Sequence, residues 1–248
     1  MTPLQSRMRA AAWALTLWTL ALWTLALTVL ATPAVAQDQA ASVTAKAEQG
    51  DADAQLQLAD AYLLGQLGLK PSEADAARWA QKAADQRNAD AEAMLAGFYV
   101  DGIGVAKDEA KAIDLLGDAM DKKNGMAFFV ASRIARAKTD PDHDTRANGL
   151  LRIGAYLGNR PSLLGMGDIY AAGQGVNADP LRSFAWYAVA AVLFGKDNAP
   201  AELIVKFRAA GAKLSPDQQK AGQNLAERCL DTELLDCGLP DVPLNMAR

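Results

Sequence analysis

The chain has few of the residues on which most enzymes and metal sites depend. Its 248 residues contain one histidine, His143, and two cysteines, Cys229 and Cys237. A single histidine excludes zinc sites built from several histidines, including the His-Glu-x-x-His arrangement of metalloproteases. The sequence has no Gly-x-Ser-x-Gly segment, and no serine is followed three residues later by lysine, so two common nucleophile motifs are absent. We therefore expect no catalytic, cofactor-binding or metal-binding residues.

The sequence also lacks an excess of positive charge. It has 25 lysines and arginines against 29 aspartates and glutamates. Proteins that bind nucleic acid carry a clustered basic face, so we expect no nucleic-acid partner.

Aromatic residues make up only 6% of the chain, which leaves alanine-rich helices to form most of the core. A chain of this length can still bury a sizeable core.

Residues 1–36 have the features of an export signal. Their only charged residues are two arginines near the start, and an uninterrupted apolar run covers residues 10–30. Residues 34–36 read Ala-Val-Ala, the small-x-small pattern that signal peptidase requires. We predict cleavage between Ala36 and Gln37, and a periplasmic protein with 23 basic and 29 acidic residues.

An uncleaved membrane anchor is the alternative for the same segment, because about 20 apolar residues can span a bilayer. The protein would then be anchored in the inner membrane, and this is the only case in which we expect a membrane contact. Thr32-Pro33 predicts the end of the apolar helix, and residues 37–43 are expected to form a linker.

One short pattern recurs four times and predicts the fold. It consists of an apolar residue, a small residue, two spacers, tyrosine, two spacers and glycine. The four copies are Leu58-Ala59-x-x-Tyr62-x-x-Gly65, Leu95-Ala96-x-x-Tyr99-x-x-Gly102, Val130-Ala131-x-x-Ile134-x-x-Ala137 and Met166-Gly167-x-x-Tyr170-x-x-Gly173. The steps between them are 37, 35 and 36 residues, which is typical of a stacked repeat array. Such arrays usually bind other molecules rather than transform them.

Each repeat reads as two helices joined by a glycine turn. The apolar, small and tyrosine positions share one helix face, and the glycine ends the helix in a left-handed conformation. Ser72, Asp108 and Asp179 follow the turns at the position of a helix N-cap. The second helices carry large anchors such as Trp79 and Trp186, which we expect to pack inside rather than to stack on sugars. The residues assigned structural roles in the repeats are Tyr62, Gly65, Trp79, Tyr99, Gly102, Gly104, Tyr170, Gly173, Gly175 and Trp186.

These motifs make the chain similar to the Sel1-like repeat family, relatives of the tetratricopeptide repeat. The resemblance rests on the run from Ala54 to Tyr62, on the Gly-x-Gly-Val turns and on Lys82-Ala83-Ala84, and it covers residues 44–199. It implies an all-α, right-handed α-solenoid of about four helix-turn-helix repeats with a concave binding surface. Exported members are often periplasmic adaptors or regulators in envelope, secretion or polysaccharide systems.

The third copy is degenerate, with Ile134 for tyrosine and Ala137 for glycine, and an acidic loop follows it. The loop reads Asp140-Pro-Asp142-His143-Asp144, which resembles the start of a calcium loop. The glycine and the final glutamate of such a loop are missing, so we expect a solvated turn whose last aspartate caps the next helix. Metal binding, and a Ser–His–Asp site that uses His143, stay alternatives. Because the loop interrupts the regular array, it is also the place where we expect partner specificity.

The repeats end near residue 199, and a cap of two helices is expected over residues 200–230. Ser215-Pro-Asp-Gln218 is a capping box that opens the second of them. Residues 231–248 show little periodicity and are expected to form a tail. In an exported protein two such cysteines typically pair, so Cys229 and Cys237 are predicted to form a disulfide, with free thiols or a redox pair as alternatives.

The sequence thus predicts a periplasmic, non-enzymatic module that holds a protein partner on the concave face of the solenoid. The alternative function is an envelope hydrolase or glycan-binding factor, related to cysteine-rich family members that bind or hydrolyse β-lactams. Those relatives resemble repeats with a cysteine pair in each unit, whereas the repeats of this chain contain no cysteine.

Overall fold

The computed structural model describes residues 32–195 and 198–232, and within these ranges every regular element is a helix. The predicted all-α fold built from helix-turn-helix repeats is confirmed. The chain divides into two compact units, residues 1–79 and 80–248, with the boundary inside helix α4 (Glu73–Asp85). Among the described helices, none is both long and apolar enough to cross a membrane.

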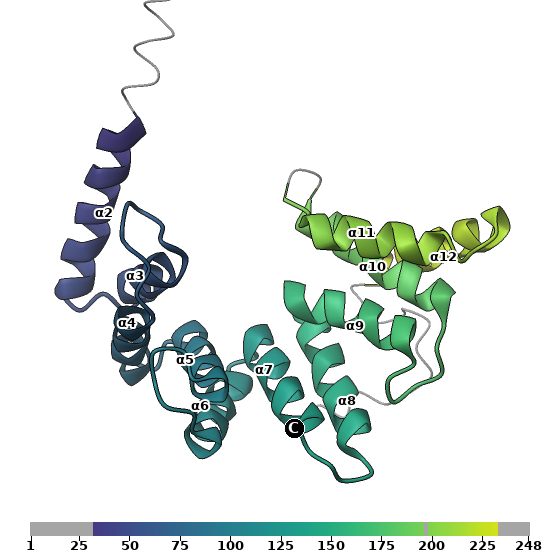
Figure 1. Cartoon of the computed structure of the whole chain (residues 1–248), viewed down its shortest axis with the longest axis horizontal. Coiled ribbons are helices and arrows are strands. Elements are labelled where there is room, and N and C mark those ends of the chain that lie inside the picture. The colour runs from purple at the N-terminus through teal and green to yellow at the C-terminus, as the bar shows by residue number, and fades with distance from the viewer. Residues whose placement is uncertain (1–31, 196–197, 233–248) are drawn as a thin grey trace, which may run out of the picture. The chain divides into compact units, whose positions relative to one another are not determined.

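Eight of the helices form four consecutive pairs that match the predicted repeats (Figure 1). The first helices of the pairs are α3 (Ala52–Leu64), α5 (Ala89–Asp101), α7 (Gly125–Arg136) and α9 (Arg160–Ala172). The second helices are α4, α6 (Glu109–Asp121), α8 (His143–Tyr156) and α10 (Pro180–Phe194). The pattern of apolar and small residues therefore lies on the first helix of every pair, as the sequence predicts.

The expected linker over residues 37–43 is wrong. These residues belong to helix α2 (Thr32–Glu48), which packs against α3 in the first unit. Pro33 does not stop this helix because it lies in its first turn, where the backbone N–H that proline lacks would have no helical partner. The predicted cleavage site between Ala36 and Gln37 falls within α2, and residues 1–31 lie outside the described part of the chain.

Glycine ends the first helix in the three regular repeats. Gly65, Gly102 and Gly173 adopt left-handed conformations with φ of 65°, 79° and 70°. This reversal of the chain lets the N-cap residue of the second helix donate its backbone N–H to the carbonyl of the motif tyrosine, at 2.9–3.0 Å. The three pairs are Ser72 with Tyr62, Asp108 with Tyr99 and Asp179 with Tyr170. Each turn thus satisfies a carbonyl that the helix end would leave unpaired.

A second set of caps, which the sequence analysis missed, precedes the first helices. An Asp or Asn side chain accepts the backbone N–H three residues later at 2.8–3.0 Å in all four repeats. The four cap residues are Asp51, Asn88, Asn124 and Asn159. Their spacing follows the repeat period, so the signal was present in the sequence. Substituting such a cap by alanine typically costs about 1 kcal/mol.

The core is formed by small residues and a few large ones. Leu58, Leu95 and Leu163 of the motif helices are at most 1% exposed. Trp79 and Trp186 are 5% and 2% exposed, so both act as packing anchors and neither offers a face for a sugar.

The C-terminal helices α11 (Ala201–Gly211) and α12 (Pro216–Asp231) lie beside α10 and close the second unit (Figure 1). The capping box of Ser215 and Gln218 is present, as predicted. Phe207 of α11 stacks on Phe184 of α10 with ring centroids 4.6 Å apart. Cys229 is 1% exposed in α12, whereas Cys237 and the tail beyond residue 232 lie outside the described residues. The disulfide stays a prediction.

Candidate functional site

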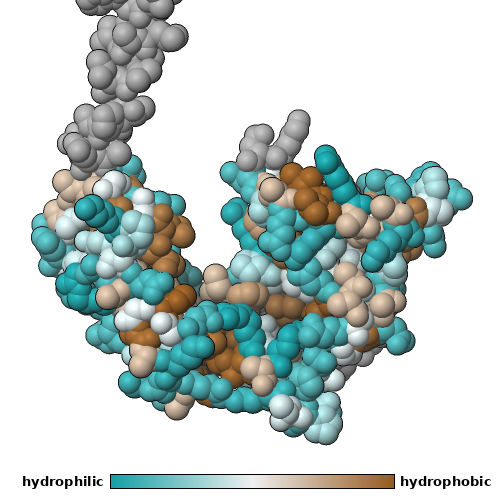
Figure 2. All heavy atoms as spheres, viewed as in Figure 1, coloured by the Kyte–Doolittle hydropathy of each residue, from teal (hydrophilic) through white to brown (hydrophobic). Residues whose placement is uncertain are grey.

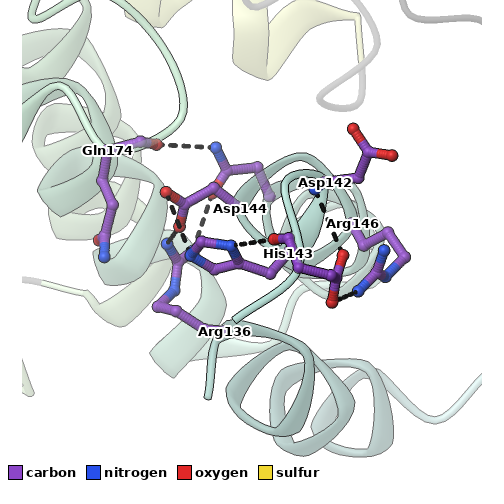
Figure 3. A network of polar contacts seen from close by, with 8 residues as sticks. Arg136, Asp142, His143, Asp144, Arg146 and Gln174 are labelled. Carbon is purple, nitrogen blue, oxygen red and sulfur yellow. Dashed lines mark hydrogen bonds and ion pairs between the residues drawn. The ribbon is translucent and has the colours of Figure 1, made fainter. Parts of the chain in front are cut away.

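The acidic loop of the third repeat is part of a polar network (Figure 3). Arg136 of α7 donates to the Asp144 carboxylate at 2.9 Å and to the Asn148 side-chain oxygen at 2.8 Å. Asn148 in turn donates to the backbone carbonyl of Gln174, in the glycine turn of the fourth repeat, at 2.9 Å. The network therefore joins the third repeat to the fourth, and its charges are matched within the chain.

The two outer aspartates of the loop have different roles. Asp140 pairs with Arg146 at 2.6 Å, and this hydrogen bond holds the pKa of the Asp140 carboxyl below its usual range. The prediction that Asp144 caps the next helix is wrong. Helix α8 begins at His143, so Asp144 lies inside its first turn, and the cap position falls on Asp142, whose side chain makes no capping hydrogen bond.

His143 contacts two aspartate residues of the acidic loop. Its Nδ1 lies 2.6 Å from the Asp140 carbonyl oxygen, and its Nε2 lies 3.7 Å from the Asp144 carboxylate. Across residues 32–195 and 198–232, no group of three or more His, Cys, Asp or Glu side chains is placed to hold a metal ion. The Asp144 carboxylate is engaged by Arg136, which leaves it a poor ligand for a cation.

We expect Asp142→Ala and Asp144→Ala to differ in their effect on stability. Asp142 caps nothing, so its loss should change the free energy of unfolding by less than about 0.5 kcal/mol. Loss of Asp144 leaves the half-buried Arg136 without its carboxylate and should cost about 1 kcal/mol. Urea denaturation measures both values. Calcium titration by calorimetry should give no binding heat for either variant or for the unmodified chain, and a calcium signal that Asp142→Ala removes would contradict this assignment.

An apolar groove of about 340 Å³ lies between α6 and α7. Its lining residues are Ile113, Leu116, Gly117 and Met120 of α6, Ala131, Ile134 and Ala135 of α7, Lys138 after α7 and Arg146 of α8. Ile113 is 51% exposed at its edge, whereas Leu116 and Ile134 are buried in its floor. A Cβ atom added to Gly117 would meet no atom within 4 Å, so the α6 side of the groove is open.

The charged residues that line the groove are both cations. Lys138 pairs with Glu109, and Arg146 pairs with Asp140 at 2.6 Å. Neither carboxylate belongs to the lining, so the groove combines an apolar floor with two cationic side chains and no acidic one. Such a surface suits an apolar or aromatic group better than a metal ion or a cationic ligand.

A second exposed apolar surface lies where α10 ends and α11 begins. Its four branched aliphatic side chains are 41–66% exposed and are Val192, Leu193, Ile204 and Val205. Figure 2 shows it as hydrophobic surface next to the grey loop, and further hydrophobic surface is visible in the lower middle of the view, around α7. Contiguous apolar surface of this kind commonly marks a protein-interaction site.

Neither apolar surface was predicted residue by residue. The residues singled out by the motif lie in the turns and the core, as the glycine and tryptophan positions show. The one signal that points to the groove is the degenerate third copy, because Ala131 and Ile134 of that copy line it.

Comparison with known proteins identifies three of the repeats. The Sel1 repeat model matches residues 52–88, 89–117 and 161–191, which correspond to the first, second and fourth helix pairs. These three helix pairs are Sel1 repeats. Most of its third repeat lies between the second and third matches, in agreement with the degenerate motif there. Sel1 repeat proteins generally mediate protein–protein interactions and are generally non-catalytic scaffolds.

Two solved structures are similar to this chain. A protective antigen of uropathogenic Escherichia coli with an SLR fold is 22% identical, with a TM-score of 0.60 over 83% of this chain and 44% of that one. A Sel1 repeat protein from Oxalobacter formigenes is 26% identical, with a TM-score of 0.49 over 70% of this chain and 49% of that one. The chain therefore spans about half the length of either. The first likeness supports the fold, and the search of curated proteins found no match.

Proposed function

We propose that this protein is an exported, non-enzymatic adaptor or regulator that binds a protein partner in a cell-envelope, secretion or polysaccharide system. The observation that carries the proposal is the array of Sel1 repeats, whose general role is protein–protein interaction. The open apolar groove of the third repeat supports it, because the groove adds an apolar floor to the exposed Ile113 and such surfaces commonly contact another protein. The concave face implied by the family resemblance is proposed as a further contact surface.

The proposed location is the periplasm, with an inner-membrane anchor as the alternative. Support comes from the sequence of residues 1–36, which combines early arginines, an apolar run and an Ala-Val-Ala cleavage pattern. Expression of the full chain in a Gram-negative host, followed by fractionation and N-terminal sequencing, tests both forms. Gln37 as the first residue of a periplasmic product supports cleavage, whereas a membrane fraction that keeps residues 1–36 supports the anchor.

A pull-down from periplasmic extract, with the exported protein as bait, tests for the partner. A single protein that stays bound in stoichiometric amount through gel filtration supports an adaptor. The alternative function, an envelope hydrolase or glycan-binding factor, predicts instead turnover of nitrocefin or retention on peptidoglycan. Either of these results without a stoichiometric protein partner would overturn the proposal.

A further inference from the structure

Two regular repeats share a contact between a tyrosine and a cation. The Nζ atom of Lys111 lies 5.3 Å from the centre of the Tyr99 ring, and the guanidinium carbon of Arg182 lies 5.7 Å from that of Tyr170. In both cases the cation follows the motif tyrosine by twelve residues along the chain. A cation over the face of an aromatic ring is attracted by the negative charge density of that face.

The third repeat keeps the cation but lacks the ring. Arg146 follows Ile134 by the same twelve residues, and Ile134 stands where the other repeats have tyrosine. Among the residues that the structure describes, no aromatic ring lies against Arg146. Both side chains line the groove between α6 and α7. The groove is therefore found at the position where the array places a tyrosine ring in its regular repeats.

The cations are held in comparable ways in the three repeats. Lys111 is tethered by Asp108 at 3.4 Å and Arg182 by Asp179 at 3.6 Å, each an aspartate near the start of the same helix. Arg146 is tethered by Asp140 at 2.6 Å through one terminal nitrogen. A guanidinium bound at its edge keeps its flat faces available for stacking.

We propose that the groove binds an aromatic side chain of a partner protein, whose ring takes the place of the missing tyrosine beside Arg146. The proposal rests on the proposed function, because it names the chemistry of one contact with the bound partner. The cationic lining complements the electronegative face of a ring. Leu116 and Ile134 supply an apolar floor, and the Met120 thioether favours contact with a ring edge. The volume of about 340 Å³ accommodates one aromatic side chain.

The test uses p-cresol, which is the tyrosine side chain, and 4-methylcyclohexanol, its aliphatic counterpart of similar size. Each is titrated into the 13C-methyl-labelled protein while the Ile113, Met120 and Ile134 methyl signals are followed by NMR. We expect saturable shifts at these three methyls, with p-cresol binding roughly two- to fivefold more tightly than 4-methylcyclohexanol. Equal affinities, or shifts that do not saturate or appear at other methyls, would overturn the proposal.

Three variants separate the groove from general effects on the fold. Ile134→Tyr restores the ring within the chain and should abolish p-cresol binding while keeping or raising the melting temperature. Gly117→Leu fills the groove from α6 and should abolish binding as well, which keeps the test decisive if Ile134→Tyr does not fold. Arg146→Gln should leave binding of 4-methylcyclohexanol unchanged and remove the preference for p-cresol. Gly149→Ala, at an open position of α8, is the matched control and should bind as the unmodified chain does.

The titration needs no natural partner, so its outcome is independent of the search for one. A stoichiometric partner together with no p-cresol binding would overturn the proposed aromatic pocket and leave the adaptor role in place. Saturable p-cresol binding without any protein partner would keep the pocket and overturn the adaptor role. If both succeed, Ile134→Tyr should also weaken capture of the partner, and capture unaffected by this variant would show that the partner does not use the groove.

Discussion

Lys122→Met is expected to lower the free energy of unfolding by about 3 kcal/mol, the loss typical of a buried charge that loses its partner. The Glu92 side chain is only 2% exposed, and the Lys122 ammonium contacts its carboxylate at 2.8 Å. The same ammonium donates to the Arg87 carbonyl at 2.8 Å, so one side chain connects α6 to the turn before α5. Methionine fills a similar volume but leaves the buried carboxylate with only the more distant Arg87 guanidinium, 3.7 Å away.

Urea denaturation of the full chain, followed by circular dichroism, measures this loss. Lys111→Met is the matched control, because Lys111 is 62% exposed and its pair with Asp108 should contribute less than about 1 kcal/mol. The double variant Glu92→Gln/Lys122→Met removes the buried charge together with its partner and should recover part of the stability. A single variant Lys122→Met that unfolds at the same urea concentration as the unmodified chain would show that the pair is dispensable.

Gly167→Ala is expected to destabilise the protein by about 2 kcal/mol, although alanine normally favours a helix over glycine. A Cβ atom at this position in α9 would lie 2.3 Å from Cε1 of the Tyr187 ring on α10. The ring cannot easily move aside, because Tyr187 is 3% exposed and its hydroxyl donates to Asp168 at 2.6 Å. Burial, together with this carboxylate, raises the pKa of the Tyr187 phenol.

The control for Gly167→Ala is the same substitution at Gly149 of α8. A Cβ atom there meets nothing within 4 Å, so only the gain in helix propensity remains, up to about 1 kcal/mol. Thermal unfolding of the two variants should therefore shift in opposite directions. Shifts of the same sign would mean that the close approach of α9 and α10 at Gly167 is not required for stability.

Much of the fold was predictable because the same helix-turn-helix motif recurs several times in the sequence. The apolar, small and tyrosine positions of the motif share one helix face, and Gly167, at the small position, lies directly against Tyr187 of α10. The glycine positions predict left-handed helix ends, which Gly65, Gly102 and Gly173 adopt. Each of these features depends on local backbone conformation or on spacing along one helix, and both are recorded directly in sequence.

The errors arose where local rules allow two outcomes. Residues 37–43 were expected to form a linker, but they belong to helix α2, which has Pro33 in its first turn. In the acidic loop Asp144 was expected to cap the next helix, but it pairs with Arg136 of α7, a contact that the local sequence does not specify. The Asx caps before the first helices recur at the repeat period but were not predicted, because Asp and Asn are also common in turns and mark a cap less specifically than the glycines mark a helix end.

The sequence by itself determined the class of this protein, since an array of helix pairs at a fixed period leaves no other architecture that buries each apolar face. It also marked the third repeat as irregular through Ile134 and Ala137. Only the tertiary structure decided what that irregularity means, because the groove needs side chains from α6, α7 and α8 to come together. The acidic loop, which is the more conspicuous feature in sequence, turned out to be matched within the chain. The physical reason is that the charges of a loop are consecutive in the sequence and can be recognised there. The residues of a groove are distant in the sequence, and only folding brings them side by side.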